Sequence, residues 1–325
     1  MQTVPVGLNY GNQRNYCFDA GTSPVLRVQP GEMFVAETED AYNGVLREDP
    51  GLLQPRDMGT YVKHSPFWYN PVCGPIYVEG ARRGDALAVT VHSIENMSTG
   101  IVTTVPGAHH FSGLKGWEET DEMYTATVAN SESESVFSYG NHSFRWRPQP
   151  FIGTIATAPE HEVLSSLPTS FGSVMASGGN LDCNAIRPGA TVYLQSLNDG
   201  GLLFFGDLHA SQGDGELCGV ANEIAARVTL SCEVVRKKRL RNVRIDTGES
   251  LISLFCYRPM EKGFQEAVRD LILWLEEDYG FSRREAYLLM SVCPEFRLRT
   301  YQMCSGLGRL MTTAGAEFPK RLLPA

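Results

Sequence analysis

The sequence predicts a β-rich α+β fold, with packed sandwich- or barrel-like β domains followed by a few C-terminal helices. Its 325 residues include 32 glycines and 18 prolines, which supply the many turns that short strands require. Apolar residues alternate with polar ones after several of these turns, whereas a helical period is clear only towards the C-terminus. These three observations favour sheets as the main architecture.

The expected strands follow glycine-containing turns in three places, at residues 29–38, 81–91 and 187–197. Proline fixes φ and glycine accepts a positive φ, so a Pro-Gly pair suits a tight turn. In the first unit Met33 and Val35 lie on one side of the extended chain, and the other two units alternate in the same way. The pattern predicts three half-buried strands.

The chain length suggests about two domains. An acidic, serine-rich stretch at 130–135, followed by Pro148 and Pro150, predicts a long surface loop or a domain boundary. We therefore expect two β-rich domains, an N-terminal one over 1–145 and a second one over 146–325. The second domain is expected to carry the site loops (178–223) and the C-terminal helices (264–292).

Two helices are predicted near the C-terminus. Apolar residues from Phe264 to Leu275 share one helical face, and Gly280 is placed to end that helix. Ser282 and Glu285 form a capping-box pattern that opens a second helix. Nothing in these helices suggests chemistry, so we expect them to pack against the sheets.

Composition and charge exclude several classes of protein. The net charge of −9 disfavours nucleic acid as a partner, because phosphate binding relies on a basic surface. The sequence contains no run of 18 apolar residues, so no membrane span is predicted. The N-terminus has no apolar region typical of a secretory signal. Eight cysteines without a C-x-x-C pair are typical of reduced thiols. We expect a cytoplasmic homo-oligomer that acts on a small molecule.

Two polar segments are the best candidates for chemistry, 178–182 and 206–216, the second of which follows an apolar run. Residues two apart in extended chain share a face, so Asp207 and His209 are expected to lie together. Glycines in the second segment would let Glu216 fold back towards His209. Imidazole and carboxylate groups are ligands for zinc, which can leave a position open for water. A purely structural glycine-rich loop remains the alternative.

A cysteine nucleophile is a weaker hypothesis. Cys183 directly follows Asp182, and Cys218 lies two positions after Glu216. Cysteine hydrolysis needs a nearby base, and the sequence places no obvious histidine or lysine beside either thiol.

Longer segments resemble a known family. GGNLDCNAIRPGATVYLQ (178–195) and GGLLFFGDLHASQGDGELCGVANE (200–223) are similar to the central signature of the acetamidase/formamidase family. Further agreement is spread from about residue 15 to about residue 320, including SRREAYLLMSVCPEFRLR (282–299). The resemblance implies a β-rich hydrolase that acts on the C–N bond of small linear, or cyclic, amides and releases ammonia or an amine.

The resemblance also implies a divalent metal, zinc in the first place and calcium as the alternative. Carried over by position, it assigns metal binding to Asp182 and His209, with Asp207 either as a further ligand or as a residue that supports the ligands. Glu216 becomes the expected general base, and Asn180 is expected to polarise the amide carbonyl together with backbone N–H groups. The predicted substrate contacts are Gly178 and Gly179. Apart from the resemblance, the residue pattern adds His109 in a predicted loop and Glu79 in the YVEGA segment as further candidate contacts.

The sequence departs from the family pattern near the N-terminus. Many relatives have a histidine a few residues before an aromatic-Asp pair, and here Asn15 precedes Phe18-Asp19. The segment 108–133 is also distinctive. These departures leave two alternatives open: an altered reaction, such as lactam opening or a biosynthetic amide-processing step, and a non-catalytic homologue that binds a small molecule.

Overall fold

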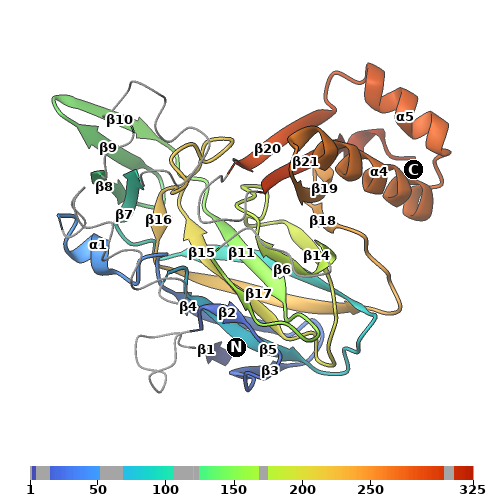
Figure 1. The fold of residues 1–325 in the computed structure, drawn as a ribbon, viewed down its shortest axis with the longest axis horizontal. Helices are drawn as coiled ribbons and strands as arrows, with labels where there is room; N and C mark the ends of the chain where they lie inside the picture. The colour runs from blue at the N-terminus through green and yellow to red at the C-terminus, as the bar shows by residue number, and fades with distance from the viewer. Residues whose placement is uncertain are drawn as a thin grey trace.

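The computed structural model describes residues 2–4, 15–51, 69–104, 120, 124–167, 175–303 and 311–324. The predicted site residue His109 lies outside these ranges. Within them the chain forms two large sheets and a few helices, which confirms the predicted β-rich α+β fold (Figure 1).

The first sheet has nine strands, and most of its neighbours are antiparallel. In spatial order they are β1 (Gln2–Val4), β4 (Met33–Thr38), β17 (Ala226–Val235), β6 (Ala86–Glu95), β14 (Thr191–Gln195), β18 (Val243–Asp246), β19 (Ser250–Tyr257), β21 (Thr312–Pro319) and β20 (Arg297–Met303).

The second sheet has ten strands and carries the candidate site. Its main path is β10 (His142–Trp146), β9 (Ser135–Tyr139), β8 (Tyr124–Asn130), β7 (Gly100–Thr104), β16 (Glu223–Ile224), β15 (Leu203–His209), β11 (Phe151–Thr157) and β13 (Gly178–Asn180). β5 (Val72–Val78) also pairs with β15, and β3 (Leu26–Val28) pairs with β5. A separate two-stranded sheet joins β2 (Cys17–Phe18) to β12 (Leu164–Ser165).

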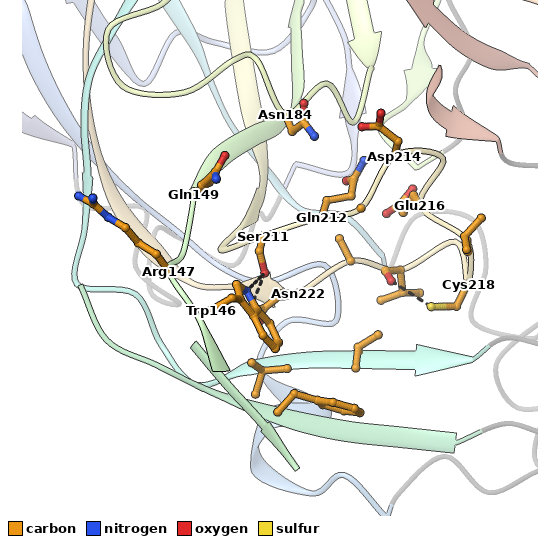
Figure 2. Close-up of a pocket in the computed structure, with 17 residues that line it drawn as sticks. Trp146, Arg147, Gln149, Asn184, Ser211, Gln212, Asp214, Glu216, Cys218 and Asn222 are labelled. Atoms are coloured by element: carbon orange, nitrogen blue, oxygen red, sulfur yellow. Dashed lines mark hydrogen bonds between the residues drawn. The ribbon is translucent and has the colours of Figure 1, made fainter. Parts of the chain in front are cut away.

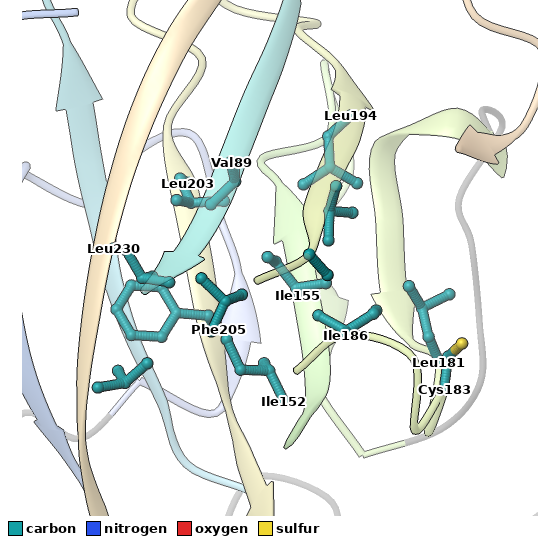
Figure 3. Packing of buried hydrophobic residues seen from close by; sticks show 14 of the residues in the cluster. Val89, Ile152, Ile155, Leu181, Cys183, Ile186, Leu194, Leu203, Phe205 and Leu230 are labelled. Atoms are coloured by element: carbon teal, nitrogen blue, oxygen red, sulfur yellow. The ribbon is translucent and has the colours of Figure 1, made fainter. Parts of the chain in front are cut away.

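The main core is built from side chains of both large sheets (Figure 3). Ile155 and Phe205 come from the second sheet, and they share this cluster with Val89, Leu194 and Leu230 from the first. Each of these side chains is fully buried, and burial of one such side chain contributes about 1.5–3 kcal/mol. β15 is buried along its whole length, so the residues at its end have a rigid support.

The three predicted turn–strand units are confirmed. Gly31, Gly84 and Gly189 adopt φ values of 78°, 91° and 94°, in the left-handed region that favours glycine. Each turn leads directly into a strand, β4, β6 and β14 respectively.

The stretch at 130–135 is not the long loop that the sequence predicts. Ser131 N–H donates to Glu134 O at 2.9 Å, so a short turn joins β8 and β9 into a hairpin. The strands of 1–145 and 146–325 are also interleaved in both sheets. β17 pairs with β4 and β6, and β15 pairs with β5, so the two ranges share one core.

The two C-terminal helices are confirmed as α4 (Met260–Tyr279) and α5 (Arg283–Val292). Gly280 ends α4 in the left-handed conformation, and the Ser282–Glu285 capping box begins α5. α4 packs against β19 and β21 at one end of the molecule (Figure 1). The short helical elements are α1 (Val45–Glu48), η2 (Met175–Ser177) and η3 (Lys320–Leu322).

A buried ion pair joins α4 to the first sheet. Arg244 of β18 donates to both carboxylate oxygens of Asp270 at 3.0 Å, and Ser253 adds a hydrogen bond of 2.9 Å to the same carboxylate.

None of the described helices has the length and apolar character needed to cross a membrane.

Candidate metal-binding and catalytic site

The site is centred on the end of β15. His209 is the last residue of this strand, and its Nε2 lies 3.4 Å from Oδ1 of Asp207, two residues earlier. Both side chains are buried. The expectation that Asp207 and His209 share a face is therefore confirmed.

Asp182 reaches the same place from the loop after β13. The N–H groups of Leu181 and Asp182 both donate to Gly153 O of β11, at 2.9 and 3.0 Å. A Cβ at Gly153 would lie 2.8 Å from Oδ1 of Asp182 and 2.8 Å from Oδ2 of Asp207. Because real Cβ contacts are longer than this, the absence of a side chain at Gly153 creates the space for both carboxylates.

Glu216 comes from the glycine-rich loop after β15, as the sequence predicts. Gly215 N–H donates to Tyr301 O at 3.1 Å and Gly215 O accepts from Met303 N–H at 3.0 Å, which fixes the loop to β20. Glu216 is buried within the site. Asp214, from the same loop, instead forms an exposed ion pair with Arg299.

A fourth carboxyl group belongs to Glu223 of β16. Glu223 is the register partner of His209 across the β15–β16 pair, and its Oε1 lies 3.1 Å from His209 Nε2. Among the described residues, His209 is the only cationic group within ion-pair distance of these four carboxyl groups.

Three of these acidic residues have an uncommon backbone conformation. The φ angles of Asp182, Asp207 and Glu216 are 47°, 57° and 46°, in the left-handed region that non-glycine residues rarely adopt. Such conformations cost on the order of 1–3 kcal/mol each and cluster at functional sites. Here the three residues with this conformation are acidic, and their side chains all lie near the imidazole of His209.

The polar atoms of this cluster have few hydrogen-bond partners. Asp182 Oδ1, His209 Nε2 and Glu223 Oε2 are buried and have none. The contacts of His209 Nε2 with Asp207 and Glu223 are within ion-pair distance but do not have hydrogen-bond geometry. A buried polar group without a partner is costly, so a bound cation is a natural completion.

The spacing of the ligand atoms fits a cation. One potential ligand atom from each of Asp182, His209 and Glu216 lies within 4.8 Å of the others, and the same holds for Asp207, His209 and Glu223. Atoms about 2.0–2.4 Å from one ion lie at most about 4.8 Å apart. The two groups share the imidazole of His209.

Without a cation the cluster favours bound protons. Burial and the nearby Asp207 raise the pKa of Asp182 well above its usual value, and burial with Asp182 does the same for Glu216. Burial raises the pKa of Glu223 to about 7. Burial opposes the charged form of both His209 and Asp207, but the attraction of Glu223 and Asp207 for the imidazole, and of the imidazole for Asp207, prevails. The pKa of His209 is therefore raised and that of Asp207 is lowered.

Gln212 fixes the orientation of the His209 imidazole. Its Nε2 donates to Asp182 O at 2.8 Å and to Tyr301 O at 2.9 Å, so its Oε1 must face His209 Nδ1 at 3.0 Å. An amide oxygen accepts but does not donate, so Nδ1 carries the proton and Nε2 faces the carboxylates. This is the arrangement of a metal-binding histidine whose second nitrogen is hydrogen-bonded.

Asn180 supports the site from the side. Its Oδ1 accepts from Thr154 Oγ1 at 2.6 Å and its Nδ2 donates to Leu167 O at 2.9 Å. Thr154 Oγ1 also lies 3.1 Å from Asp207 Oδ2. Asn180 is therefore connected to the cluster through Thr154.

The remaining predicted residues lie outside the cluster. Gly178 and Gly179 pair with Ala156 and Ile155 in the β11–β13 ladder. Glu79 follows β5 and forms an ion pair with Arg27 on the surface, so the structure does not bring it to the cluster.

The two cysteines considered as nucleophiles do not have a lowered pKa. Burial raises the pKa of Cys183 to about 12 and also raises that of Cys218. A thiol must ionise to attack a carbonyl, so these environments disfavour cysteine catalysis.

Sequence reasoning missed Gly153, Gln212 and Glu223. Glu223 lies at the end of the family-like segment 200–223, but its cross-strand position depends on the pairing of β16 with β15. Gln212 follows His209 by three residues, and this short spacing was an available signal. Gly153 had no signal, because its role depends on two distant carboxylates.

A cavity of about 600 Å³ adjoins the cluster (Figure 2). Glu216 and Gln212 contribute to its lining, so the cluster and the cavity meet at these residues. Residues of β7, β8 and β9 also line it, together with Trp146 of β10.

Comparison with known proteins agrees with this architecture. An acetamidase from Yersinia enterocolitica has a crystal structure that matches with a TM-score of 0.82 and 31% sequence identity, over 100% of this chain and 93% of that one. The shared fold places the protein in the structural class of the acetamidases. A model of the Acetamidase/Formamidase family matches residues 17–177 and 172–251, and the chain belongs to this family.

Two curated relatives are more distant. A formamidase candidate of Schizosaccharomyces pombe is 27% identical over 215 residues, which cover 50% of this chain and 51% of the relative. The formamidase of Methylophilus methylotrophus is 24% identical over 273 residues, which cover 67% of this chain and 64% of the relative. The chain thus matches about half to two thirds of the length of these relatives.

Proposed function

We propose that this protein hydrolyses the C–N bond of a primary amide with the help of a divalent cation bound in the His209 cluster. Water and the amide R–CO–NH2 give the acid R–COOH and ammonia. Family membership supports the reaction class, since relatives carry the names acetamidase and formamidase. The observation that supports the site is the set of buried polar atoms without hydrogen-bond partners around His209.

Asp182, His209 and Glu216 are the proposed ligands. Of the two groups with suitable spacing, this one adjoins the cavity through Glu216, so a substrate can reach it. Nitrogen and carboxylate donors suit zinc, which is our first choice, with calcium as the alternative. A bound cation of this kind polarises a carbonyl oxygen and lowers the pKa of water.

The residues that do not hold the cation have separate roles in this proposal. Glu223 is suited to proton transfer, because its Oε1 lies 3.1 Å from His209 Nε2, beside the proposed ligands, and its Oε2 has no hydrogen-bond partner. Asp207 balances charge beside His209, and Gln212 orients the imidazole. The sequence-based choice of Glu216 as general base is the competing assignment.

Metal analysis of purified variants tests the proposal. Elemental analysis should find about one divalent cation per wild-type chain, and Asp182→Ala and His209→Ala should each lose it. Asp214→Ala is the matched control, because Asp214 lies in the same loop and is exposed. Equal metal content in all four proteins would refute the site.

Activity measurements separate the roles of the two glutamates. Glu223→Gln should retain the cation and release ammonia from amides at least about 100-fold more slowly, as expected for loss of a proton-transfer group. Glu216→Gln should lose the cation. If Glu216→Gln instead keeps the metal and loses activity, Glu216 is the base. Wild-type protein that binds metal and amides without releasing ammonia would be a binding protein.

A further inference from the structure

The cavity beside Glu216 is larger than a formamidase or acetamidase reaction requires. Its volume of about 600 Å³ falls in the range of roughly 300–1,000 Å³ that is typical of sites for drug-sized ligands. A water molecule occupies about 30 Å³ of the liquid, and formamide or acetamide fills the space of only a few waters.

The lining of the cavity combines polar and apolar side chains. Gln212 and Glu216 are polar lining residues where the cavity meets the cluster, and the apolar Leu217 and Val220 follow them in the same loop. An apolar wall is formed by Val102 of β7, Val128 of β8 and Phe137 of β9, all from adjacent strands of one sheet. A molecule that fits this cavity has one polar end and one apolar end.

Trp146 is held in place as part of the apolar wall. Its Nε1–H donates to Ser211 Oγ at 3.0 Å, and Asn222 Nδ2 donates to the same oxygen at 3.2 Å (Figure 2). The indole ring therefore has a fixed position beside the cavity. A preorganised aromatic surface binds an apolar group with little loss of conformational entropy.

The charges near the cavity do not favour a strongly acidic substrate. Glu216 lies at the junction with the cluster, and Asp214 at the rim is already paired with Arg299. Arg147 also contributes to the lining, but its side chain extends away from the other labelled residues (Figure 2). An uncharged amide with an apolar tail is the better match.

We propose that the preferred substrates are primary amides of acids with an extended apolar or aryl chain, whose acyl group lies along Trp146, Phe137 and Val128. This inference rests on the proposed amide hydrolysis and specifies its substrate class. The carboxamide end would point towards Glu216 and the cluster.

A series of amides tests the inference directly. Ammonia release is measured for formamide, acetamide, butyramide, hexanamide and 3-phenylpropionamide, and kcat/KM is compared. An added methylene in an apolar pocket changes kcat/KM by about tenfold or more, so hexanamide and 3-phenylpropionamide should exceed acetamide by at least about 100-fold.

Variants of Trp146 connect the preference to this wall. Trp146→Ala should lower the ratio of kcat/KM for 3-phenylpropionamide to that for acetamide by about tenfold or more. Trp146→Phe keeps an aromatic face and should retain most of the ratio. Tyr139→Ala is the matched control, because Tyr139 is an exposed aromatic residue on the adjacent strand β9 and does not line the cavity.

The outcomes distinguish this inference from the proposed function. Acetamide or formamide turned over as fast as the longer amides would overturn the substrate class and leave amide hydrolysis intact. Preference for long amides that is unchanged in Trp146→Ala would overturn the role of this cavity. Absence of ammonia release from every amide, with metal bound, would overturn the proposed function and the inference together.

Discussion

His209 and Gln212 form a hydrogen bond in which neither partner can reverse its role. Nδ1 of His209 and Oε1 of Gln212 are 3.0 Å apart, and the other end of the Gln212 amide donates to two backbone carbonyl groups. One of these carbonyls belongs to Asp182 and the other to Tyr301. A single amide thus sets the histidine tautomer and joins β20 to the loop that carries Asp182.

Replacing Gln212 should weaken metal binding. Gln212→Leu removes the acceptor for Nδ1–H, so the imidazole loses its fixed tautomer, and zinc affinity should fall about 10- to 100-fold. Competition with a chromophoric chelator measures the affinity. Gln149→Leu serves as the control, because Gln149 is an exposed amide that pairs with Arg187. Equal affinities of Gln212→Leu and wild type would contradict the positioning role.

Adding one methyl group at Gly153 should damage the site. In Gly153→Ala the new Cβ would meet carboxylate oxygens of Asp182 and Asp207 at 2.8 Å, so these side chains must move. We expect a loss of about 1–3 kcal/mol in the free energy of unfolding and weaker metal binding. Chemical denaturation and metal titration report the two effects. Gly213→Ala should change neither, because its Cβ would meet nothing within 4 Å.

The metal-free protein should lose stability as pH rises. The folded-state pKa of Glu223, about 7, exceeds the ordinary glutamate value of 4.5, so the folded chain binds more protons. The resulting stabilisation is complete below about pH 4.5 and is lost as pH rises through about 7, on the order of 3 kcal/mol. Urea unfolding of the chelator-treated protein at several pH values measures this.

Two comparisons test the origin of that pH dependence. Glu223→Gln cannot ionise, so its metal-free stability should vary less with pH than that of wild type. A bound cation displaces protons from its ligands, so zinc should stabilise wild type more at higher pH. Identical pH slopes for Glu223→Gln and wild type would assign the effect to other groups.

Breaking the ion pair between α4 and the first sheet should strongly destabilise the protein. Asp270→Ala leaves the buried Arg244 guanidinium without its bidentate partner and should cost about 3–5 kcal/mol. Denaturant unfolding gives the value. Glu276 lies on α4, like Asp270, and forms an exposed ion pair with Arg283 of α5. Glu276→Ala removes this pair and should cost less than about 1 kcal/mol. Similar losses in both variants would show that the burial of Asp270 has no special effect.

The sequence predicted the local features of the fold well. Turn glycines such as Gly31, the Ser282–Glu285 capping box and the end of α4 at Gly280 depend on neighbouring residues, and all are confirmed. The stretch at 130–135 was misjudged because polar residues suit both a long loop and a short hairpin turn. Only the pairing of β8 with β9 distinguishes the two.

The candidate site was predictable in part for the same reason. Asp207 and His209 are two residues apart on one strand, so their shared side was predictable, whereas the left-handed φ of 57° at Asp207 was not. The contribution of Glu223 follows from register across β15 and β16, and the space at Gly153 follows from two loops that meet there. Such relationships depend on long-range pairing, which the residue pattern alone does not encode.

The interleaved strands bear on how the molecule could be divided. All five residues of the acidic cluster lie between 182 and 223, so a fragment that starts near 146 would contain every one of them. That fragment would nevertheless lack β5, which pairs with β15, and both β4 and β6, which flank β17. Its exposed strand edges would favour aggregation. We therefore expect the fragment from about residue 146 to bind no ion alone, and to bind one only when it is co-expressed with the N-terminal piece and reassembles with it.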